Sequence, residues 1–190
     1  MAAQAVQIRR LTREEFDRLV ASGFFHPEER LELIEGELIQ MTPQGSAHAS
    51  AIRLIEEALR TSFGTGHDVR VQMPLALLRD SEPEPDVAVV VGSARTYRDA
   101  HPNAAVLVVE VADATLEYDR GRKADLYARA GIPELWILNL SDRRLEVSRD
   151  PGTEGVDRAR YRTHLVFAAS DSVAPLGCPG VSIAVSDLLP

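Results

Sequence analysis

The sequence is poor in cysteine, lysine and long apolar runs, and each shortage excludes a class of protein. Cys178 is the only cysteine, which excludes an intrachain disulfide framework and a thiolate metal cluster. No apolar run approaches the ~18 residues of a membrane-spanning helix. The opening MAAQAVQIRRLTREEF has no apolar core of signal-peptide length. We therefore expect a soluble, cytoplasmic protein with no membrane partner.

Basic residues are outnumbered by acids, and only one of them is lysine. The chain has 21 Lys+Arg against 29 Asp+Glu, a net charge of -8. This charge argues against indiscriminate coating of nucleic acid, which depends on cations that neutralise phosphates. The lone lysine, Lys123, is a chance remainder of an arginine-rich composition or marks a site that needs a compact, titratable ammonium. Around it, Arg120, Arg122 and Arg129 form either a local basic patch or a solvated helix face.

The length and composition fit one compact domain. A chain of 190 residues with 45% hydrophobic content can bury a sizeable core. We expect residues 1–190 to form a single domain, with residues 1–29 as an N-terminal helical extension. Within that extension, Thr12 and Glu15 have the spacing of a capping box, which predicts the start of a short helix.

The remaining elements follow from apolar periodicity and turn residues. RLELIEGELIQM alternates around Glu35-Gly36 and predicts a hairpin, whereas PDVAVVV and AAVLVVEVA are nearly continuous apolar runs, typical of buried strands. The other predictions are a helix from Ser46 ending at Gly64, a strand in DVRVQMPLALL, a helix from Asp119 to Ala130, strands in ELWILNL, RRLEVSR and YRTHLVFAA, an exposed loop in DPGTEGVDRAR, and a helical turn in VSDLLP. This order indicates an α/β (α+β) fold with a mixed central β-sheet flanked by helices.

Two acids interrupt strands that otherwise have the composition of an interior. Asp86 stands at the start of VAVVV, and Glu110 lies inside VLVVEVA, on the same strand face as Val108 and Ala112. A buried carboxylate costs several kcal/mol unless a cation or hydrogen-bond donors satisfy it. A metal ion is one such cation.

Lys123 is placed to reach these acids. Its spacing to Leu126 and Tyr127 puts it on the apolar stripe of the predicted helix, one short loop after Glu110. Two carboxylates and a lysine suit metal-assisted phosphodiester hydrolysis, in which Mg²⁺ polarises the phosphate and a water and the lysine orients or deprotonates the nucleophile. The alternative is a structural ion pair between Glu110 and Lys123, with Asp86 capping a turn.

Three stretches together resemble a known family. EPDVAVV, VLVVEVADATLEYDRGRKADLYARAGIPELWILNL and LELIEGELIQMTPQGSAHASAI are similar to the Uma-two family of restriction-endonuclease-like proteins, within the PD-(D/E)XK nuclease superfamily, over residues 30–189. The resemblance implies a restriction-endonuclease-like core in which Asp86 and Glu110 bind Mg²⁺, for which Mn²⁺ can substitute. The superfamily lysine two residues after the second acid is here Ala112. The resemblance implies that Lys123, on the following helix, takes its role.

The resemblance also implicates Glu37 and His48 as catalytic residues. Glu37 would be a further metal ligand or contact the water, and His48 would contact phosphate or cap the cleft. The structural alternatives are an exposed hairpin glutamate and a hydrogen-bonding residue at a helix end. Glu84 and Tyr127 are candidates for supporting the site.

These residues predict a Mg²⁺-dependent, endodeoxyribonuclease-like hydrolase that cleaves phosphodiester bonds in nucleic acid, with DNA as the expected substrate. A homodimer is expected, since two sites suit the cutting of two strands. Two alternatives stay open: an inactive nuclease fold that serves as a binding or assembly module, and a hydrolase of another phosphoester.

Overall fold

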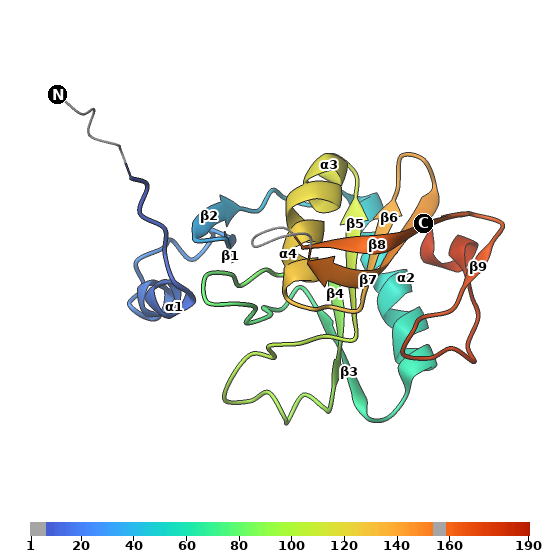
Figure 1. The fold of residues 1–190 in the computed structure, drawn as a ribbon, viewed down its shortest axis with the longest axis horizontal. Helices are drawn as coiled ribbons and strands as arrows, with labels where there is room; N and C mark the ends of the chain where they lie inside the picture. The colour runs from blue at the N-terminus through green and yellow to red at the C-terminus, as the bar shows by residue number, and fades with distance from the viewer. Residues whose placement is uncertain (1–6, 154–158) are drawn as a thin grey trace.

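A six-stranded mixed sheet forms the centre of the molecule (Figure 1). The structure is a computed structural model that describes residues 7–153 and 159–190. Strand order follows the sequence, and every pair is antiparallel except β5 with β6. The strands are β3 (His67–Val71), β4 (Val87–Val91), β5 (Leu107–Ala112), β6 (Glu134–Asn139), β7 (Arg144–Thr153) and β8 (Ala159–Ala168). The mixed central sheet expected from the sequence is confirmed.

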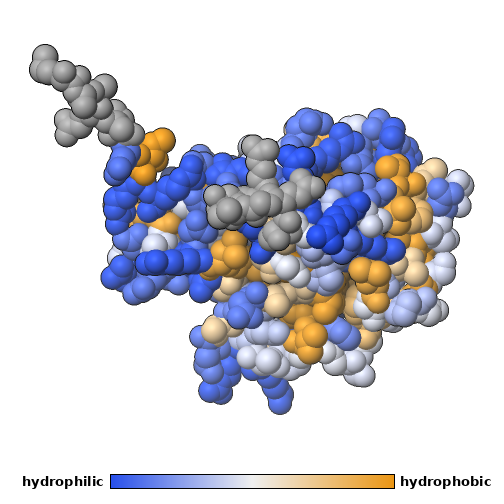
Figure 2. Space-filling model, viewed as in Figure 1, coloured by the Kyte–Doolittle hydropathy of each residue, from blue (hydrophilic) through white to orange (hydrophobic). Residues whose placement is uncertain are grey.

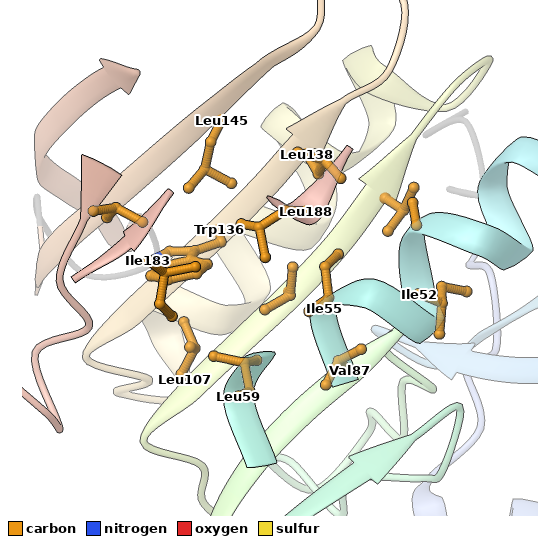
Figure 3. Packing of buried hydrophobic residues seen from close by; sticks show 14 of the residues in the cluster. Ile52, Ile55, Leu59, Val87, Leu107, Trp136, Leu138, Leu145, Ile183 and Leu188 are labelled. Carbon is orange, nitrogen blue, oxygen red and sulfur yellow. The ribbon is translucent and has the colours of Figure 1, made fainter. Parts of the chain in front are cut away.

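Alternating residues of the strands bury two opposite faces of this sheet. Helix α2 (Ser46–Phe63) covers one face, where Ile55 and Leu59 pack near Leu107 of β5 (Figure 3). The C-terminal elements β9 (Ser172–Val173), β10 (Ile183–Ala184) and the 3-10 turn η2 (Val185–Leu188) pack into the same cluster. The other face carries the crossover between β5 and β6. The result is a helix-sheet-helix sandwich.

The crossover contains a π-helical turn. It runs as α3 (Leu116–Tyr118), η1 (Asp119–Lys123) and α4 (Ala124–Arg129), and only the last part of the predicted α-helix is α-helical. In η1 the backbone N–H of Ala124 donates to the carbonyl of Asp119, five residues earlier. π-turns hold one residue more per turn than an α-helix and occur often at functional sites. The sequence periodicity of an α-helix does not reveal such an insertion.

The N-terminal helix and the hairpin lie beside the sheet (Figure 1). Helix α1 (Arg13–Ala21) begins at the predicted capping box of Thr12 and Glu15. Strands β1 (Leu31–Ile34) and β2 (Glu37–Gln40) form the predicted hairpin. Its turn has positive φ at Glu35 (51°) and Gly36 (77°), as a two-residue type I′ turn requires. A Cβ at Gly36 would lie 2.4 Å from the Cβ of Arg10, so only glycine fits.

Two predicted boundaries were wrong. The strand expected in DVRVQMPLALL ends at Val71, where Gln72 takes a positive φ of 50°. The loop expected in DPGTEGVDRAR is largely strand, because β7 runs to Thr153 and β8 begins at Ala159; residues 154–158 lie outside the described residues. Pro151 lies in the part of β7 beyond Arg149, where β7 pairs with β8 but no longer with β6. In the two described ranges, no helix is both long and apolar enough to cross a membrane.

The hairpin is tied to the segment before β4 by a bridge between Leu33 and Glu82. The side chain of Glu82 is buried, with Asp17 and Glu84 nearby and Arg13 at 3.9 Å. Burial, together with the charges of Asp17 and Glu84 and against that of Arg13, raises the pKa of Glu82 to about 7. The protonated form of Glu82 is therefore favoured in the folded protein.

Glu82 should make stability depend on pH. Its folded-state pKa lies above the ordinary 4.5, so its stabilisation is complete below that value and is lost as the pH rises through about 7. Glu82→Gln should therefore raise the free energy of unfolding above pH 7 by about 1–2 kcal/mol, allowing for partial solvent screening. Denaturant unfolding at several pH values measures this effect, with the exposed Glu14→Gln as the matched control. Equal gains in both variants would contradict the assignment.

Candidate active site

Asp86 and Glu110 meet at one end of the β4–β5 pair. The antiparallel register pairs Val87 with Val109, and one further step along both strands sets Asp86 opposite Glu110. Both acids lie on the α4 side of the sheet, since their alternate neighbours Ala88 and Val108 belong to that core. The backbone N–H of Val111 donates to Oδ2 of Asp86 at 2.8 Å, which fixes the aspartate against β5.

Asp86 is held as a carboxylate by several donors. Its Oδ1 lies 3.2 Å from Nε2 of His48 and accepts from Nε2 of Gln72 at 3.3 Å and of Gln44 at 3.5 Å. Burial alone would raise the pKa of Asp86, but the bonds from His48 and Val111, with the charge of Lys123, leave it below the ordinary value. His48 reaches the acid from the first turns of α2.

Lys123 and Tyr127 hold Glu110 from the crossover. Nζ of Lys123 lies 3.1 Å from Oε1 of Glu110, and the Tyr127 hydroxyl donates to the same oxygen at 2.5 Å. Burial raises the pKa of Glu110 to about 8; Lys123 opposes this, and neighbouring acids add to it. Burial disfavours the charged form of Lys123, yet the carboxylates around it keep its pKa above the ordinary value. The lysine therefore stays an ammonium.

Two buried acids at this centre were not predicted from the sequence. Glu32 of β1 is 1% exposed, lies 3.5 Å from Nζ of Lys123 and accepts the backbone N–H of Glu84 at 3.0 Å. Asp119 of η1 is 3% exposed and accepts the hydroxyl of Thr115 at 2.7 Å, while burial raises its pKa. Glu32 gave no clear signal, because it shares a mixed strand face with Ile34, whereas Leu31 and Leu33 form the apolar face. Asp119 gave no signal, because it stood at a predicted helix start.

A cavity of about 330 Å³ opens onto this cluster. Glu32, Asp86, Glu110, Asp119 and Lys123 line it together with His48 and Gln44. Tyr118 also lines it; the hydroxyl of Tyr118 is buried with no hydrogen-bond partner among the described residues, and burial raises the pKa of this phenol to about 12. Ile39, Met41 and Pro43 add an apolar portion from β2 and the loop that follows.

Glu37 and Glu84 lie apart from this cavity. Glu37 pairs with Arg10 at 3.0 Å and Arg122 at 2.7 Å, and it fastens the hairpin to the crossover. The structure therefore does not bring Glu37 to the other predicted site residues. Glu84 pairs with Arg30 at 3.5 Å, and its backbone N–H donates to Glu32 of the cluster.

The donor set suits a hard divalent cation. In the described ranges no three Asp, Glu, His or Cys side chains are arranged as a ready metal cage. Mg²⁺, however, is commonly held by one or two carboxylates with waters and substrate phosphates. Four buried acids surround the single ammonium of Lys123, and burial and this crowding raise the pKa of Glu110 and of Asp119; a bound divalent ion would favour their charged forms. The chemistry of these oxygen donors is therefore compatible with a divalent cation such as Mg²⁺.

Comparisons with known proteins agree with this fold. The chain is similar to a solved structure titled as a putative nuclease belonging to DUF820 from Anabaena variabilis ATCC 29413, with 18% identity and a TM-score of 0.71. The match covers 94% of this chain and 97% of that one, and at this identity it shows the fold. No curated protein matches the chain. The profile of the Uma2 family, described as "Putative restriction endonuclease", matches residues 13–186, and the chain therefore belongs to the Uma2 family.

Proposed function

We propose that the protein is a metal-dependent endonuclease that hydrolyses phosphodiester bonds of nucleic acid. The observation that carries this proposal is the convergence of Asp86, Glu110 and Lys123, from two strands and a helix, at one cavity. Family membership supports the nuclease assignment. A DNA substrate, a cytoplasmic location and a homodimer belong to the same proposal.

Mg²⁺ bound by Asp86 and Glu110 would polarise the scissile phosphate and neutralise its charge. Hydrolysis joins the oxygen of a water to phosphorus, breaks one ester P–O bond and transfers a proton to the departing sugar oxygen. The Lys123 ammonium would orient the incoming water and offset the negative charge that develops on the phosphate. Because this ammonium is buried, its field is weakly screened by solvent.

The neighbouring side chains would position these groups. Oδ1 of Asp86 is contacted by His48, Gln44 and Gln72. These contacts fix the rotamer of Asp86 and with it the position of Oδ2. Tyr127 fixes Glu110 through Oε1, which leaves Oε2 as the oxygen for a metal. Such preorganisation lowers the cost of assembling the reacting geometry.

Asp86→Asn should remove both metal binding and cleavage. The amide keeps the shape of the side chain but loses the charge, and cleavage with Mg²⁺ or Mn²⁺ should fall on the order of 10²–10⁴-fold. Calorimetric titration with Mn²⁺ and cleavage of labelled DNA and RNA measure the two effects. Asp99→Asn, on an exposed loop and paired only with Arg98, is the matched control.

The same pair of measurements separates the proposal from its alternatives. A wild-type protein that binds Mn²⁺ at Asp86 but leaves every nucleic acid intact would favour hydrolysis of another phosphoester. Neither metal binding nor cleavage by the folded wild type would favour a binding or assembly module.

A further inference from the structure

The arginines near the cavity are already neutralised by acids. Lys123 is the one lysine or arginine that lines the cavity, as far as the described residues show, and it is paired with Glu110 and Glu32. The surrounding guanidinium groups each pair with a glutamate: Arg10 with Glu37, Arg30 with Glu84, Arg120 with Glu117 and Glu146, Arg122 with Glu35 and Glu37, and Arg129 with Glu35. The sequence cluster around Lys123 is therefore a network of ion pairs, and it is not an open basic patch.

This network limits how much nucleic acid can be held outside the cavity. Duplex-binding proteins contact several phosphates, and each contact needs a cation that is free to displace a counterion. Here Arg122 bonds Glu35, Glu37 and the carbonyl of Ile34, all of which a phosphate would have to replace. Hydrophilic residues cover α1 and the surface around α3 (Figure 2), but Arg120 and Arg122 of η1 are paired with acids.

The cavity itself suits one nucleotide unit. Its volume of about 330 Å³ lies at the small end of small-molecule sites, which span ~300–1,000 Å³. Ile39 and Met41 are half-buried and line it along with Pro43, close to the acids that would bind the metal. A base released from stacking can lie against such apolar side chains, whereas a base stacked and paired inside a duplex cannot enter.

We propose that this site takes a single-stranded nucleic acid, with one phosphate at the acid cluster and an adjacent unstacked base against Ile39, Met41 and Pro43. This inference rests on the proposed nuclease function and specifies its substrate. The cavity discriminates single strands from duplex. The flanking phosphates contribute little to the affinity, so the affinity should depend weakly on salt concentration. One strand in one cavity requires no second copy of the chain.

The first test compares single strands with duplex on the intact protein. Fluorescence anisotropy with short labelled single-stranded DNA, single-stranded RNA and the matching DNA duplex is measured in Ca²⁺, and cleavage of the same probes in Mg²⁺ or Mn²⁺. We expect single strands to bind about tenfold more tightly than the duplex. We also expect the slope of log affinity against log salt to correspond to about one or two phosphates. The comparison of single-stranded DNA with single-stranded RNA shows whether the sugar affects binding and cleavage.

The second test changes the apolar part of the cavity. Met41→Gln should raise KM for a single-stranded probe about tenfold with a smaller effect on kcat, because it weakens binding without touching the acids. Leu38→Gln, at an exposed residue of the preceding strand β2 that does not line the cavity, is the matched control.

The outcomes separate this inference from the nuclease proposal. Equal binding and cleavage of duplex and single strand would overturn the substrate assignment and leave the nuclease standing. Selective binding of single strands without cleavage of any probe would support the assignment and overturn the nuclease. No binding of any single strand would overturn the substrate assignment.

Discussion

Replacing Lys123 by methionine should abolish metal-dependent cleavage and lower stability at neutral pH. Methionine keeps the length of the side chain but removes the only ammonium among the buried acids, and activity should fall on the order of 10²–10⁴-fold. Breaking a buried ion pair costs about 3–5 kcal/mol, because the remaining charge has no partner. Cleavage assays and denaturant unfolding measure the two losses.

The pH dependence of stability and a second substitution show whether the uncompensated charge of Glu110 causes the instability of Lys123→Met. Without Lys123 the pKa of Glu110 loses its main opposing charge and rises further, so the protonated form is favoured in the folded protein. A carboxyl with a raised folded-state pKa stabilises at low pH and loses that stabilisation as the pH rises. The variant should therefore be closer to wild type at about pH 6 than at about pH 8.5. Adding Glu110→Gln should restore stability without restoring cleavage; recovery of cleavage would contradict the proposed roles.

Deleting Gly121 should also inactivate the protein, through geometry alone. The deletion removes one residue from η1, so the turn can close as an α-helix, and the orientation of Asp119 relative to Lys123 then changes by about 30°. At the radius of the side-chain ends this rotation amounts to about 3 Å, so the two groups no longer keep their present positions in the cavity. Misplacement of a reacting group costs on the order of 10²-fold or more in rate. Cleavage measured alongside circular dichroism shows whether activity is lost while helix content is kept.

Gly121→Ala is the control for this deletion. A Cβ at position 121 meets no atom within 4 Å, and Gly121 is not among the glycines with positive φ. The substitution keeps the chain length and should preserve η1, cleavage and stability. An alanine variant as inactive as the deletion would show that the glycine itself, and not the extra residue, is required.

Much of the fold could be predicted because its strands follow simple rules of burial. The continuous apolar runs of β4 and β5 indicated strands covered on both faces, and the period of two placed Glu110 with Val108 and Ala112 correctly. The capping box at Thr12 and the turn at Glu35-Gly36 determine local structure by contacts within a few residues. Structures determined by such local contacts can be predicted from the sequence and are present in the folded protein.

The rest of the site depends on contacts that a single sequence does not contain. Glu32 joins Lys123 only because the hairpin docks beside the crossover, at a separation of many residues. Glu37, the residue directly after the hairpin turn, instead pairs with Arg10 and Arg122, away from the cavity. The π-turn replaces five residues of a predicted α-helix with almost no change in sequence pattern. Each of these outcomes is decided by tertiary packing.

The enclosed position of Lys123 gives the protein a built-in chemical reporter. Its side chain is the only ε-amine in the sequence, and in the folded state it is 6% exposed, charged and bound by two carboxylates. Acylating reagents attack neutral, accessible amines, so they can modify this one only after the crossover lifts away from the sheet. The rate of side-chain acylation, followed by mass spectrometry, therefore measures how often that opening occurs.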